Sequence, residues 1–207
     1  MERKSVLNIE QLITGLPNQL RYIKRFSNSR AIITENVTEH TFYVVIICLF
    51  IAEHLELEVE DKYELLKRAI IHDMEELFTG DIIRPIKHAD NNTKNAIHKL
   101  GGDYLKKLLN DIIPKKSGEL FLSWDKAKSG FLGRILKFSD YLSAIGYVYE
   151  EAFSGNILIL RSTNDLLEMI NLFKTDEYDF IIDLVWEVDK LLSKLIKLKE
   201  NSQCLQK

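Results

Sequence analysis

The chain has 207 residues, 46% of them hydrophobic, and its 28 basic and 31 acidic residues leave a formal net charge of −3. This composition excludes intrinsic disorder, and the near-balance of charge removes any general electrostatic case for binding a nucleic-acid polymer or an anionic membrane. Because a domain commonly holds about 100 to 200 residues, we expect residues 1–207 to form one domain around one core.

The compartment is predicted from what the sequence lacks. Cys48 and Cys204 are too few for a disulfide framework, and the first residues contain no apolar segment typical of a secretory signal. The longest apolar run, residues 42–52, is shorter than the roughly 18 to 20 residues that span a bilayer. We therefore expect a buried core helix there and a cytoplasmic protein.

Apolar residues recur at intervals of three and four along nearly the whole chain, which holds only three prolines and nine glycines. This period is typical of amphipathic helices and predicts an all-α fold. The expected helices cover, in chain order, residues 9–16, 17–26, 38–57, 61–78, 93–110, a short stretch within 114–130, then 133–153 and 164–198. Thr38 is the expected N-cap of the third helix, and residues 82–92 are expected to form a loop.

The first candidate for chemistry is the pair His72-Asp73, predicted to lie in the middle of the fourth helix. The dipeptide alone is common by chance, but Glu76 follows His72 by four residues and Asp81 comes directly after Gly80. Carboxylates this close raise one another's pKa values unless a cation compensates them, which favours a metal or catalytic site. A solvated acidic helix end is the competing interpretation.

Two further polar residues stand in apolar surroundings. His40 opens the most hydrophobic helix, and Asp140 lies inside the helical segment Ile135-Leu136-Lys137-Phe138-Ser139-Asp140. Taken singly, each has an ordinary explanation, as a helix-start histidine and as a helix residue that faces water. Together with His72 and Asp73 they supply two imidazoles and two carboxylates, a ligand set suited to a divalent ion.

The order His, His-Asp, Asp resembles the HD-domain metal-dependent phosphohydrolases, and the flanking residues resemble their YfbR-like 5′-deoxynucleotidase branch. The stretches that carry this resemblance are Arg25-Phe26, residues 34–40 (Thr-Glu-Asn-Val-Thr-Glu-His), residues 72–81 (His-Asp-Met-Glu-Glu-Leu-Phe-Thr-Gly-Asp) and residues 136–140 (Leu-Lys-Phe-Ser-Asp). These blocks are far more specific than the dipeptide, and the resemblance covers roughly residues 20–151.

The resemblance implies an HD-type helical domain in which one divalent ion is bound by a defined set of side chains. Those implied metal ligands are His40, His72, Asp73 and Asp140. The resemblance also implies that three further residues surround a nucleotide substrate, namely Glu76, Arg25 and Asp81. A bound divalent ion lowers the pKa of water and polarises a phosphoryl oxygen, so the chemistry agrees with the assignment. The ligand set accepts Co, Mn, Mg, Fe or Zn.

Each residue around the substrate has an expected role. Glu76 would orient the attacking water or accept its proton, and the planar guanidinium of Arg25 suits phosphate. Asp81 either accepts a hydrogen bond from the sugar 3′-hydroxyl or manages the proton of the leaving group. Phe26 departs from the family, which often has tryptophan there as a wall against the deoxyribose, so a smaller wall and weaker discrimination against ribonucleotides are expected.

Two histidines bear on the number of metal ions, because other HD branches bind two metals with additional histidines. His88 and His98 both follow the His-Asp pair, but the local motifs match the one-metal branch, so we interpret them as surface histidines.

Two more patterns have both a functional and an ordinary interpretation. The basic cluster Arg84, Lys87 and Lys94 either attracts a nucleotide phosphate or is a solvated face. An apolar stripe near the C-terminus, with spacings of four and three, consists of Ile181, Val185, Val188, Leu192 and Leu195. It indicates core packing, and since family members commonly dimerise, part of residues 164–198 is also a candidate homodimer interface.

The expected function is metal-dependent hydrolysis of nucleoside 5′-monophosphates, chiefly 2′-deoxy ones, to nucleoside and phosphate. The nearest alternative is a deoxynucleoside triphosphohydrolase, which would release triphosphate from the same metal site. A phosphodiester hydrolase would need a second metal. A non-catalytic nucleotide-sensing HD domain is the alternative from another class, although all seven expected site positions hold chemically competent residues.

Overall fold

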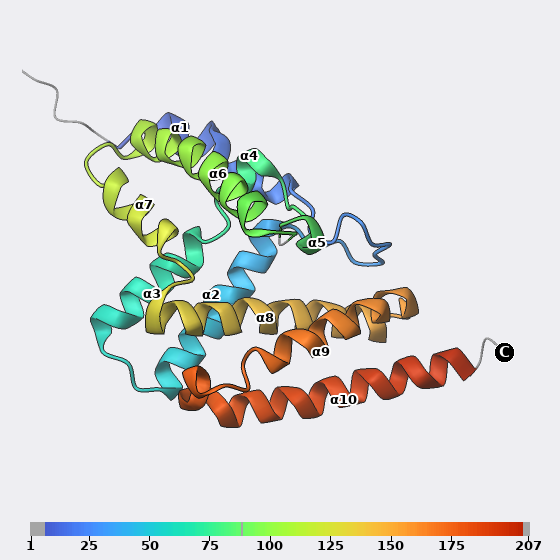
Figure 1. The fold of residues 1–207 in the computed structure, drawn as a ribbon. Coiled ribbons are helices and arrows are strands. Elements are labelled where there is room, and N and C mark those ends of the chain that lie inside the picture. Colours follow the sequence, from blue (N-terminus) through green and yellow to red (C-terminus); the bar gives the residue numbers. More distant parts are fainter. Residues whose placement is uncertain (1–6, 88, 205–207) are drawn as a thin grey trace, which may run out of the picture. The chain divides into compact units, whose positions relative to one another are not determined.

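The computed structural model describes residues 7–87 and 89–204, and every element within them is a helix (Figure 1). The α-helices are α1 (Ile9–Thr14), α2 (Val37–His54), α3 (Val59–Ile71), α4 (Glu76–Thr79), α5 (Arg84–Lys87), α6 (Asn91–Ile112), α7 (Ser117–Asp125), α8 (Gly130–Phe153), α9 (Thr163–Asn171) and α10 (Ile182–Cys204). Three 3₁₀ helices accompany them: η1 (Leu16–Tyr22), η2 (Ile157–Ser162) and η3 (Asp176–Ile181). The predicted all-α fold is confirmed.

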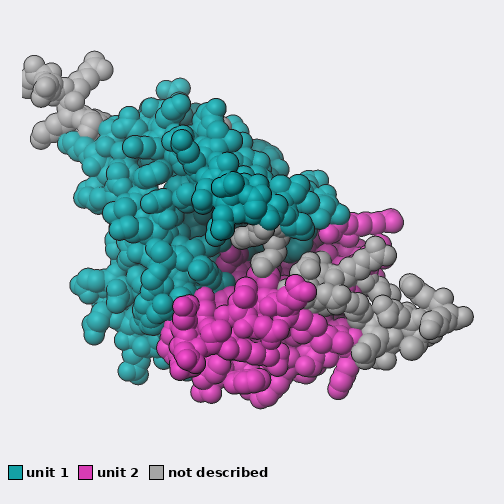
Figure 2. All heavy atoms as spheres, in the orientation of Figure 1, with its two compact units in different colours: residues 1–28, 35–139 teal, residues 29–34, 140–207 magenta. Residues whose placement is uncertain are grey.

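The chain divides into two compact units, coloured separately in Figure 2. Unit 1 comprises residues 1–28 and 35–139, and unit 2 comprises residues 29–34 and 140–207. The division falls inside α8, between Ser139 and Asp140. The expectation that residues 1–207 form one domain stays a prediction.

The core of unit 1 forms where α6 and α7 pack on each other and on the segment after α3. Its fully or almost fully buried members are Ile71, Leu105, Leu108, Leu109, Ile112 and Trp124. Helix α2 packs against α3, and its side chains at Val44, Cys48 and Ala52 have no exposed surface. Burial of an aliphatic side chain contributes about 1.5 to 3 kcal/mol, so these contacts hold the two helices that carry the candidate histidines.

Helix α2 is capped by Asn36 rather than by Thr38. The Asn36 side chain accepts a hydrogen bond from the backbone N–H of Glu39, and the Glu39 carboxylate accepts one from the backbone N–H of Asn36. This reciprocal capping box satisfies two N–H groups that the helix leaves unpaired. The predicted Thr38 cap is wrong because asparagine two residues earlier has glutamate at the required third position.

The predicted helix over residues 61–78 is also wrong, because α3 ends at Ile71 and α4 begins at Glu76. Between them the backbone tightens into turns in which Met74 N–H donates to the Ile71 carbonyl and Glu76 N–H to the Asp73 carbonyl, both at 3.1 Å. The apolar period continues through this break, with neither glycine nor proline to mark it. His72 and Asp73 therefore lie in a turn and not in the middle of a helix.

Three other segments differ from expectation. Residues 16–22 form a 3₁₀ helix that ends before Ile23, residues 84–87 form a short helix inside the predicted loop, and residues 164–198 are interrupted between α9 and α10. After η1 the chain is extended, and Lys24 forms an isolated antiparallel bridge with Asn36. This bridge fixes the segment that carries Arg25 beside the start of α2.

Two adjacent glycines of α6 serve packing and not a turn. A Cβ at Gly101 would lie 2.9 Å from Cβ of Glu75, and a Cβ at Gly102 would lie 2.9 Å from the Trp124 ring. Both distances are shorter than side-chain atoms tolerate, so only glycine lets α6 approach Glu75 and Trp124 this closely.

Unit 2 is built around the apolar stripe predicted near the C-terminus. All five stripe residues, Ile181, Val185, Val188, Leu192 and Leu195, are buried. The Tyr141 hydroxyl donates to the Leu166 carbonyl at 2.7 Å, and the Tyr141 ring contacts the Phe173 ring at 5.1 Å. The prediction of core packing is confirmed for this stripe.

Unit 2 also secures the segment of residues 29–34. The fully buried Glu151 carboxylate accepts hydrogen bonds from the backbone N–H groups of Ile32 and Ile33, and from the Asn156 side-chain amide. Asn156 donates in addition to the Arg30 carbonyl at 2.6 Å, and the Tyr147 hydroxyl donates to the Ile33 carbonyl.

By length and composition alone, α2 is the one helix in the described part of the chain that could cross a membrane. The core helix of a globular protein satisfies the same criterion. Helix α2 packs against α3 and buries His40 completely, as expected of a core helix, whereas Phe42, Tyr43 and Phe50 of the run predicted to be buried are more than half exposed.

Candidate active site

The ring of His72 is fixed by the last turn of α3. Its Nδ1 lies 2.8 Å from the carbonyl oxygen of Ala69, which can only accept a hydrogen bond. Nδ1 therefore carries the proton in this contact, and Nε2 presents its lone pair in the neutral ring. A histidine held in this way is a pre-oriented metal ligand.

Asp73 lies between the two buried imidazoles. Its Oδ2 is 2.9 Å from His72 Nε2 and 3.5 Å from His40 Nε2. Burial alone would raise the pKa of the Asp73 carboxyl, but the imidazoles of His72 and His40 more than offset it and hold that pKa well below its ordinary value. Asp73 is therefore a carboxylate at neutral pH.

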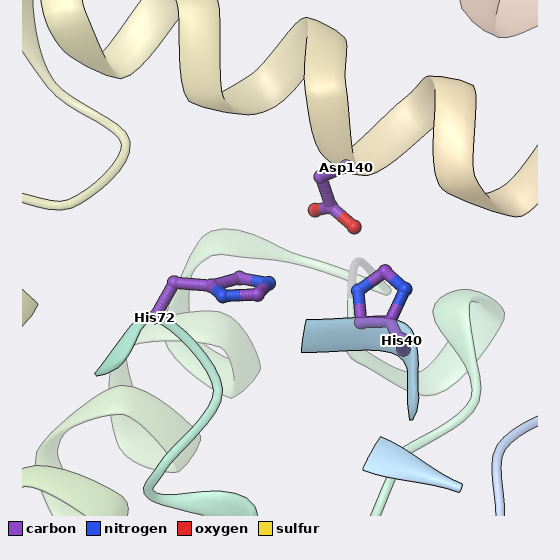
Figure 3. Close-up of side chains that lie close together, drawn as sticks. All are labelled: His40, His72 and Asp140. Carbon is purple, nitrogen blue, oxygen red and sulfur yellow. The ribbon is translucent and has the colours of Figure 1, made fainter. Parts of the chain in front are cut away.

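Three side chains from separate segments approach one another, as Figure 3 shows. His40 comes from the first turn of α2, His72 from the end of α3, and Asp140 from α8, one residue past the division within that helix. One ligand atom from each lies within 4.8 Å of the other two. The three residues span a hundred positions in sequence, so only the fold brings them together.

These residues fit a divalent cation. His72 Nε2 is buried and makes no hydrogen bond among the described residues, although Asp73 Oδ2 is 2.9 Å away. In the ring with its proton on Nδ1, the Nε2 lone pair faces this carboxylate oxygen, and a proton or a metal cation between the two atoms stabilises the arrangement. Donor atoms that each lie about 2.1 Å from one ion are separated by about 3 to 3.5 Å, which matches the contacts of Asp73 with both imidazoles.

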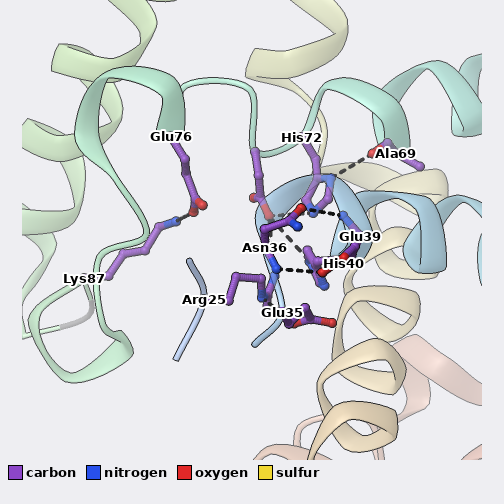
Figure 4. Close-up of polar contacts among 10 residues, drawn as sticks. Arg25, Glu35, Asn36, Glu39, His40, Ala69, His72, Glu76 and Lys87 are labelled. Carbon is purple, nitrogen blue, oxygen red and sulfur yellow. Dashed lines mark hydrogen bonds and ion pairs between the residues drawn. The ribbon is translucent and has the colours of Figure 1, made fainter. Parts of the chain in front are cut away.

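Arg25 is held beside this cluster by backbone and side-chain contacts, shown in Figure 4. Its backbone N–H donates to the Glu35 carbonyl at 2.9 Å, and its Nε lies 3.0 Å from Glu35 Oε2. One terminal nitrogen, Nη1, lies 3.9 Å from Asp73 Oδ2. The guanidinium is therefore anchored at one edge and stands next to the candidate metal ligands.

Glu76 is a buried carboxyl with a strongly raised pKa. Burial, followed by the charge of Asp73, raises the pKa of Glu76 to about 9, and the charge of Asp81 adds to this effect while Lys87 opposes it. Asp81 also acts on Glu35, whose pKa is raised chiefly by burial. Asp81 follows Gly80, which ends α4 with a φ of +69° that glycine adopts readily. The negative charge of Asp81 thus raises the pKa values of both Glu76 and Glu35.

Phe26 adopts an uncommon backbone conformation, with a φ of +51°. The Arg25 guanidinium carbon lies 5.6 Å from the centre of its half-buried ring. A non-glycine residue in this region costs about 1 to 3 kcal/mol, which the surrounding contacts must offset. The conformation turns the chain directly after Arg25 and is a feature that sequence periodicity could not indicate.

Sequence reasoning missed three residues of the site. Glu35 and Glu75 stand in the motif stretches without an expected role, and Lys87 stands only in the basic cluster. Glu75 is buried, accepts a hydrogen bond from Trp124 Nε1 at 2.7 Å, and offers an oxygen within 4.8 Å of oxygens from Asp73 and Glu76. The one sequence feature that could indicate Glu75 is its position two residues after Asp73 and directly before Glu76.

The additional histidines and the other basic residues have separate outcomes. His98 is exposed, lies 3.0 Å from Asp125 Oδ1 and stacks on the Trp124 ring at 4.5 Å. His88 lies outside the described residues. Lys87 contacts Glu76, whereas Lys94 is exposed on α6, and the side chain of Arg84 is not among those described.

Comparison with known proteins supports the same family as the motifs. The family model described as 5′-deoxynucleotidase YfbR-like matches residues 14–187. The chain is 25% identical over 172 residues to the 5′-deoxynucleotidases YfbR of Escherichia coli K12 and of Shigella boydii, covering 81% of this chain and 86% of each relative.

Solved structures share the fold. A conserved hypothetical protein of Pyrococcus furiosus is 26% identical with a TM-score of 0.61, over 88% of this chain and 99% of that one. An HD-domain phosphohydrolase of Listeria innocua is 22% identical with a TM-score of 0.62, over 91% and 98%. The HD phosphohydrolase DatZ of cyanophage S-2L, solved with dA and one catalytic Zn²⁺ ion, is 17% identical with a TM-score of 0.56, over 93% and 99%.

The family model matches residues 14–187, well over half of the chain. The chain therefore belongs to the YfbR-like 5′-deoxynucleotidase family, has the all-α HD fold, and is a phosphohydrolase.

Proposed function

We propose that this protein hydrolyses nucleoside 5′-monophosphates, with a preference for 2′-deoxynucleotides, to nucleoside and orthophosphate. The observation that carries the proposal is the approach of His40, His72 and Asp140 within 4.8 Å, with Asp73 in contact with both imidazoles. The names of the curated relatives, which are 5′-deoxynucleotidases, support the substrate class.

One divalent ion would be bound by His40, His72, Asp73 and Asp140. Two imidazoles and two carboxylates suit Mn, Co, Fe, Zn or Mg, and the single catalytic Zn²⁺ of the DatZ structure supports one ion of this class. When bound, such an ion lowers the pKa of a coordinated water and polarises a phosphoryl oxygen.

The protein's own residues then bind the phosphate and move the protons. Arg25 donates to the phosphate oxygens and offsets the negative charge that they carry during transfer, and Glu35 keeps its guanidinium in place. A bound divalent ion and Lys87 would oppose the burial that raises the pKa of Glu76, so that the ionised Glu76 accepts a proton from the attacking water as the new P–O bond forms and the bond to the 5′ oxygen breaks. The leaving 5′ oxygen takes up a proton as the nucleoside hydroxyl forms.

The sugar end of the substrate is assigned to Phe26 and Asp81. Phe26 supplies an apolar wall that would leave a ribose 2′-hydroxyl without a hydrogen-bond partner. Asp81 either accepts a hydrogen bond from the 3′-hydroxyl or manages the leaving-group proton, and Asp81→Asn would separate these roles. A higher KM for deoxy- and ribonucleotides alike with normal kcat supports the first role, and a lower kcat with normal substrate affinity supports the second.

Product analysis tests the proposal against its alternatives. The metal-reconstituted protein is incubated with ribo- and deoxynucleoside mono-, di- and triphosphates, and the products are identified by ³¹P NMR. Orthophosphate and nucleoside from a 5′-monophosphate are the expected result. Tripolyphosphate from a deoxynucleoside triphosphate would instead identify a triphosphohydrolase, and a nucleotide bound without turnover by the metal-loaded protein would identify a sensing domain.

The assembly and location of the protein complete the proposal. We propose a cytoplasmic homodimer built from one catalytic domain, with no nucleic-acid polymer or membrane as partner. Exposed Trp186 and Leu191 on α10 support an apolar contact surface beside the buried stripe. Light scattering of the purified protein measures the oligomeric state, with twice the mass of 24.1 kDa expected for the dimer.

A further inference from the structure

Lys87 is the cation that faces Glu76. Its Nζ donates a hydrogen bond to Glu76 Oε1 at 3.5 Å, and the two groups form an ion pair. The Lys87 side chain comes from the last position of α5 and reaches toward the Glu76 carboxylate in Figure 4. It is 31% exposed, whereas the Glu76 side chain is 5% exposed. The contact is therefore shielded from water on the carboxylate side.

The two oxygens of Glu76 differ in their surroundings. Oε1 accepts the contact from Lys87, whereas Oε2 is buried and makes no hydrogen bond among the described residues. Buried carboxylate oxygens are seldom left without a donor, because the lost hydration costs free energy. Oε2 is thus the oxygen that remains available to a water molecule or a substrate group.

Lys87 also reduces the excess of negative charge at the site. Asp73, Glu75 and Glu76 each offer an oxygen within 4.8 Å of the others, and a phosphate group would add further negative charge. Arg25 lies beside Asp73, and Lys87 lies beside Glu76. Lys87 thus offsets part of the negative charge beside Glu76, while Arg25 lies 3.0 Å from Glu35 and 3.9 Å from Asp73.

We propose that Lys87 is a positioning residue for Glu76: it binds Oε1 and so directs Oε2 to the attacking water. This inference rests on the proposed function. In the hydrolysis step, the water oxygen bonds to phosphorus and a proton of the water passes to Oε2. The bond from phosphorus to the 5′ oxygen breaks, and the 5′ oxygen keeps the electron pair and takes up a proton from solvent. Lys87 exchanges no proton with the substrate and acts only through the orientation and charge of Glu76.

The test compares Lys87→Met and Lys87→Arg with wild-type protein, using the full chain loaded with Mn²⁺ and a deoxynucleoside 5′-monophosphate as substrate. Lys94→Met is the matched control, because Lys94 is an exposed lysine on the neighbouring helix α6. We expect Lys87→Met to lower kcat about ten- to hundredfold with little change in KM, and Lys87→Arg to retain most of kcat. Lys94→Met should match wild type.

Two further measurements separate positioning from other roles. Bound Mn²⁺ and the calorimetric affinity for orthophosphate should be unchanged in Lys87→Met, because Lys87 binds neither group in this proposal. The double variant Lys87→Met/Glu76→Gln should be no slower than Glu76→Gln alone, since Lys87 acts through Glu76.

Specific outcomes overturn the assignment. A wild-type kcat in Lys87→Met, a loss confined to KM and orthophosphate affinity, or additive losses in the double variant would each exclude positioning through Glu76. Wild-type protein that hydrolyses no 5′-monophosphate would instead contradict the proposed function itself and, with it, this role for Lys87.

Discussion

Arg25 Nε lies 3.0 Å from Glu35 Oε2, and both side chains are almost fully buried. The backbones of the same two residues are joined by a hydrogen bond of 2.9 Å. Two contacts between one pair of residues fix both the position and the orientation of a guanidinium that also approaches Asp73. The Glu35 carboxylate thus contributes to the candidate phosphate site without belonging to the metal ligands.

Replacing Glu35 with glutamine is expected to loosen Arg25 and leave the metal in place. Glutamine keeps the size of the side chain but removes the charge that holds the guanidinium. We expect KM for a 5′-monophosphate to rise about tenfold, with bound metal unchanged. Steady-state kinetics and metal analysis check this together, and metal loss in Glu35→Gln would show that Glu35 supports the metal ligands instead.

The Glu151 network predicts a pH-dependent contribution to stability. Burial alone would raise the pKa of Glu151, but hydrogen bonds from Asn156 and the backbone N–H groups of Ile32 and Ile33 hold it below its ordinary value. Because the folded pKa is the lower one, this stabilisation is fully present above about pH 4.3, the pKa of an unfolded glutamate, and is lost as the pH falls through the folded pKa.

Glu151→Gln should therefore lower the free energy of unfolding by about 1.5 to 3 kcal/mol at pH 7, because a buried charge-assisted acceptor is lost. The difference from wild type should shrink in acid. Urea unfolding at several pH values measures it, with the exposed neighbour Glu150→Gln as the control. A difference that grows in acid would mean that the Glu151 pKa is raised and the sign reversed.

Phe26→Trp is expected to sharpen discrimination against ribonucleotides. The backbone cost of a positive φ is similar for both aromatic residues, so the substitution changes mainly the size of the apolar wall. We expect the ratio of kcat/KM for deoxy over ribo substrates to rise about fivefold, which corresponds to ~1 kcal/mol. Phe26→Leu should lower the ratio. An unchanged ratio in both variants would show that Phe26 does not act as an apolar wall against ribonucleotides.

Gly101→Ala tests the close approach of α6 to Glu75. An added Cβ would lie 2.9 Å from Cβ and Cγ of Glu75, and such overpacking outweighs the gain in helix propensity. We expect a loss of about 1 to 2 kcal/mol in the free energy of unfolding. Gly146→Ala in α8 is the matched control, because its Cβ would meet no atom within 4 Å and should stabilise the helix by up to about 1 kcal/mol. Equal effects at both positions would contradict this explanation.

Much of the fold could be predicted because the helix period is a local property, although the cap of α2 was expected at Thr38 and lies at Asn36. The apolar stripe of α10 was found from spacing alone, and it is buried as expected. The break at residues 72–75 could not be predicted, because its apolar residues continue the helical period and no proline or glycine marks it. Only the tertiary packing of Ile71 and Met74 on the core of unit 1 distinguishes the turn from a helix.

Part of the candidate site could be predicted because its motifs, like the helix period, are local in the sequence. The motifs indicated His40, His72, Asp73 and Asp140. The structure places ligand atoms of His40, His72 and Asp140 within 4.8 Å of one another and Asp73 beside both imidazoles, and their role as metal ligands stays a prediction. Glu35 and Lys87 act on Arg25 and Glu76 through contacts between segments that lie ten and eleven residues apart. No local pattern encodes such a contact, because it depends on an isolated bridge in one case and on a short irregular helix in the other.

The most direct test of the central claim is anomalous diffraction from a crystal of the protein loaded with Mn²⁺, with Asp140→Asn as the companion variant. We predict one strong peak within about 2.0 to 2.3 Å of ligand atoms from His40, His72, Asp73 and Asp140, and its loss or marked weakening in the variant. A peak bound elsewhere, or none at saturating Mn²⁺, would contradict a shared metal ion and the hydrolytic mechanism built on it.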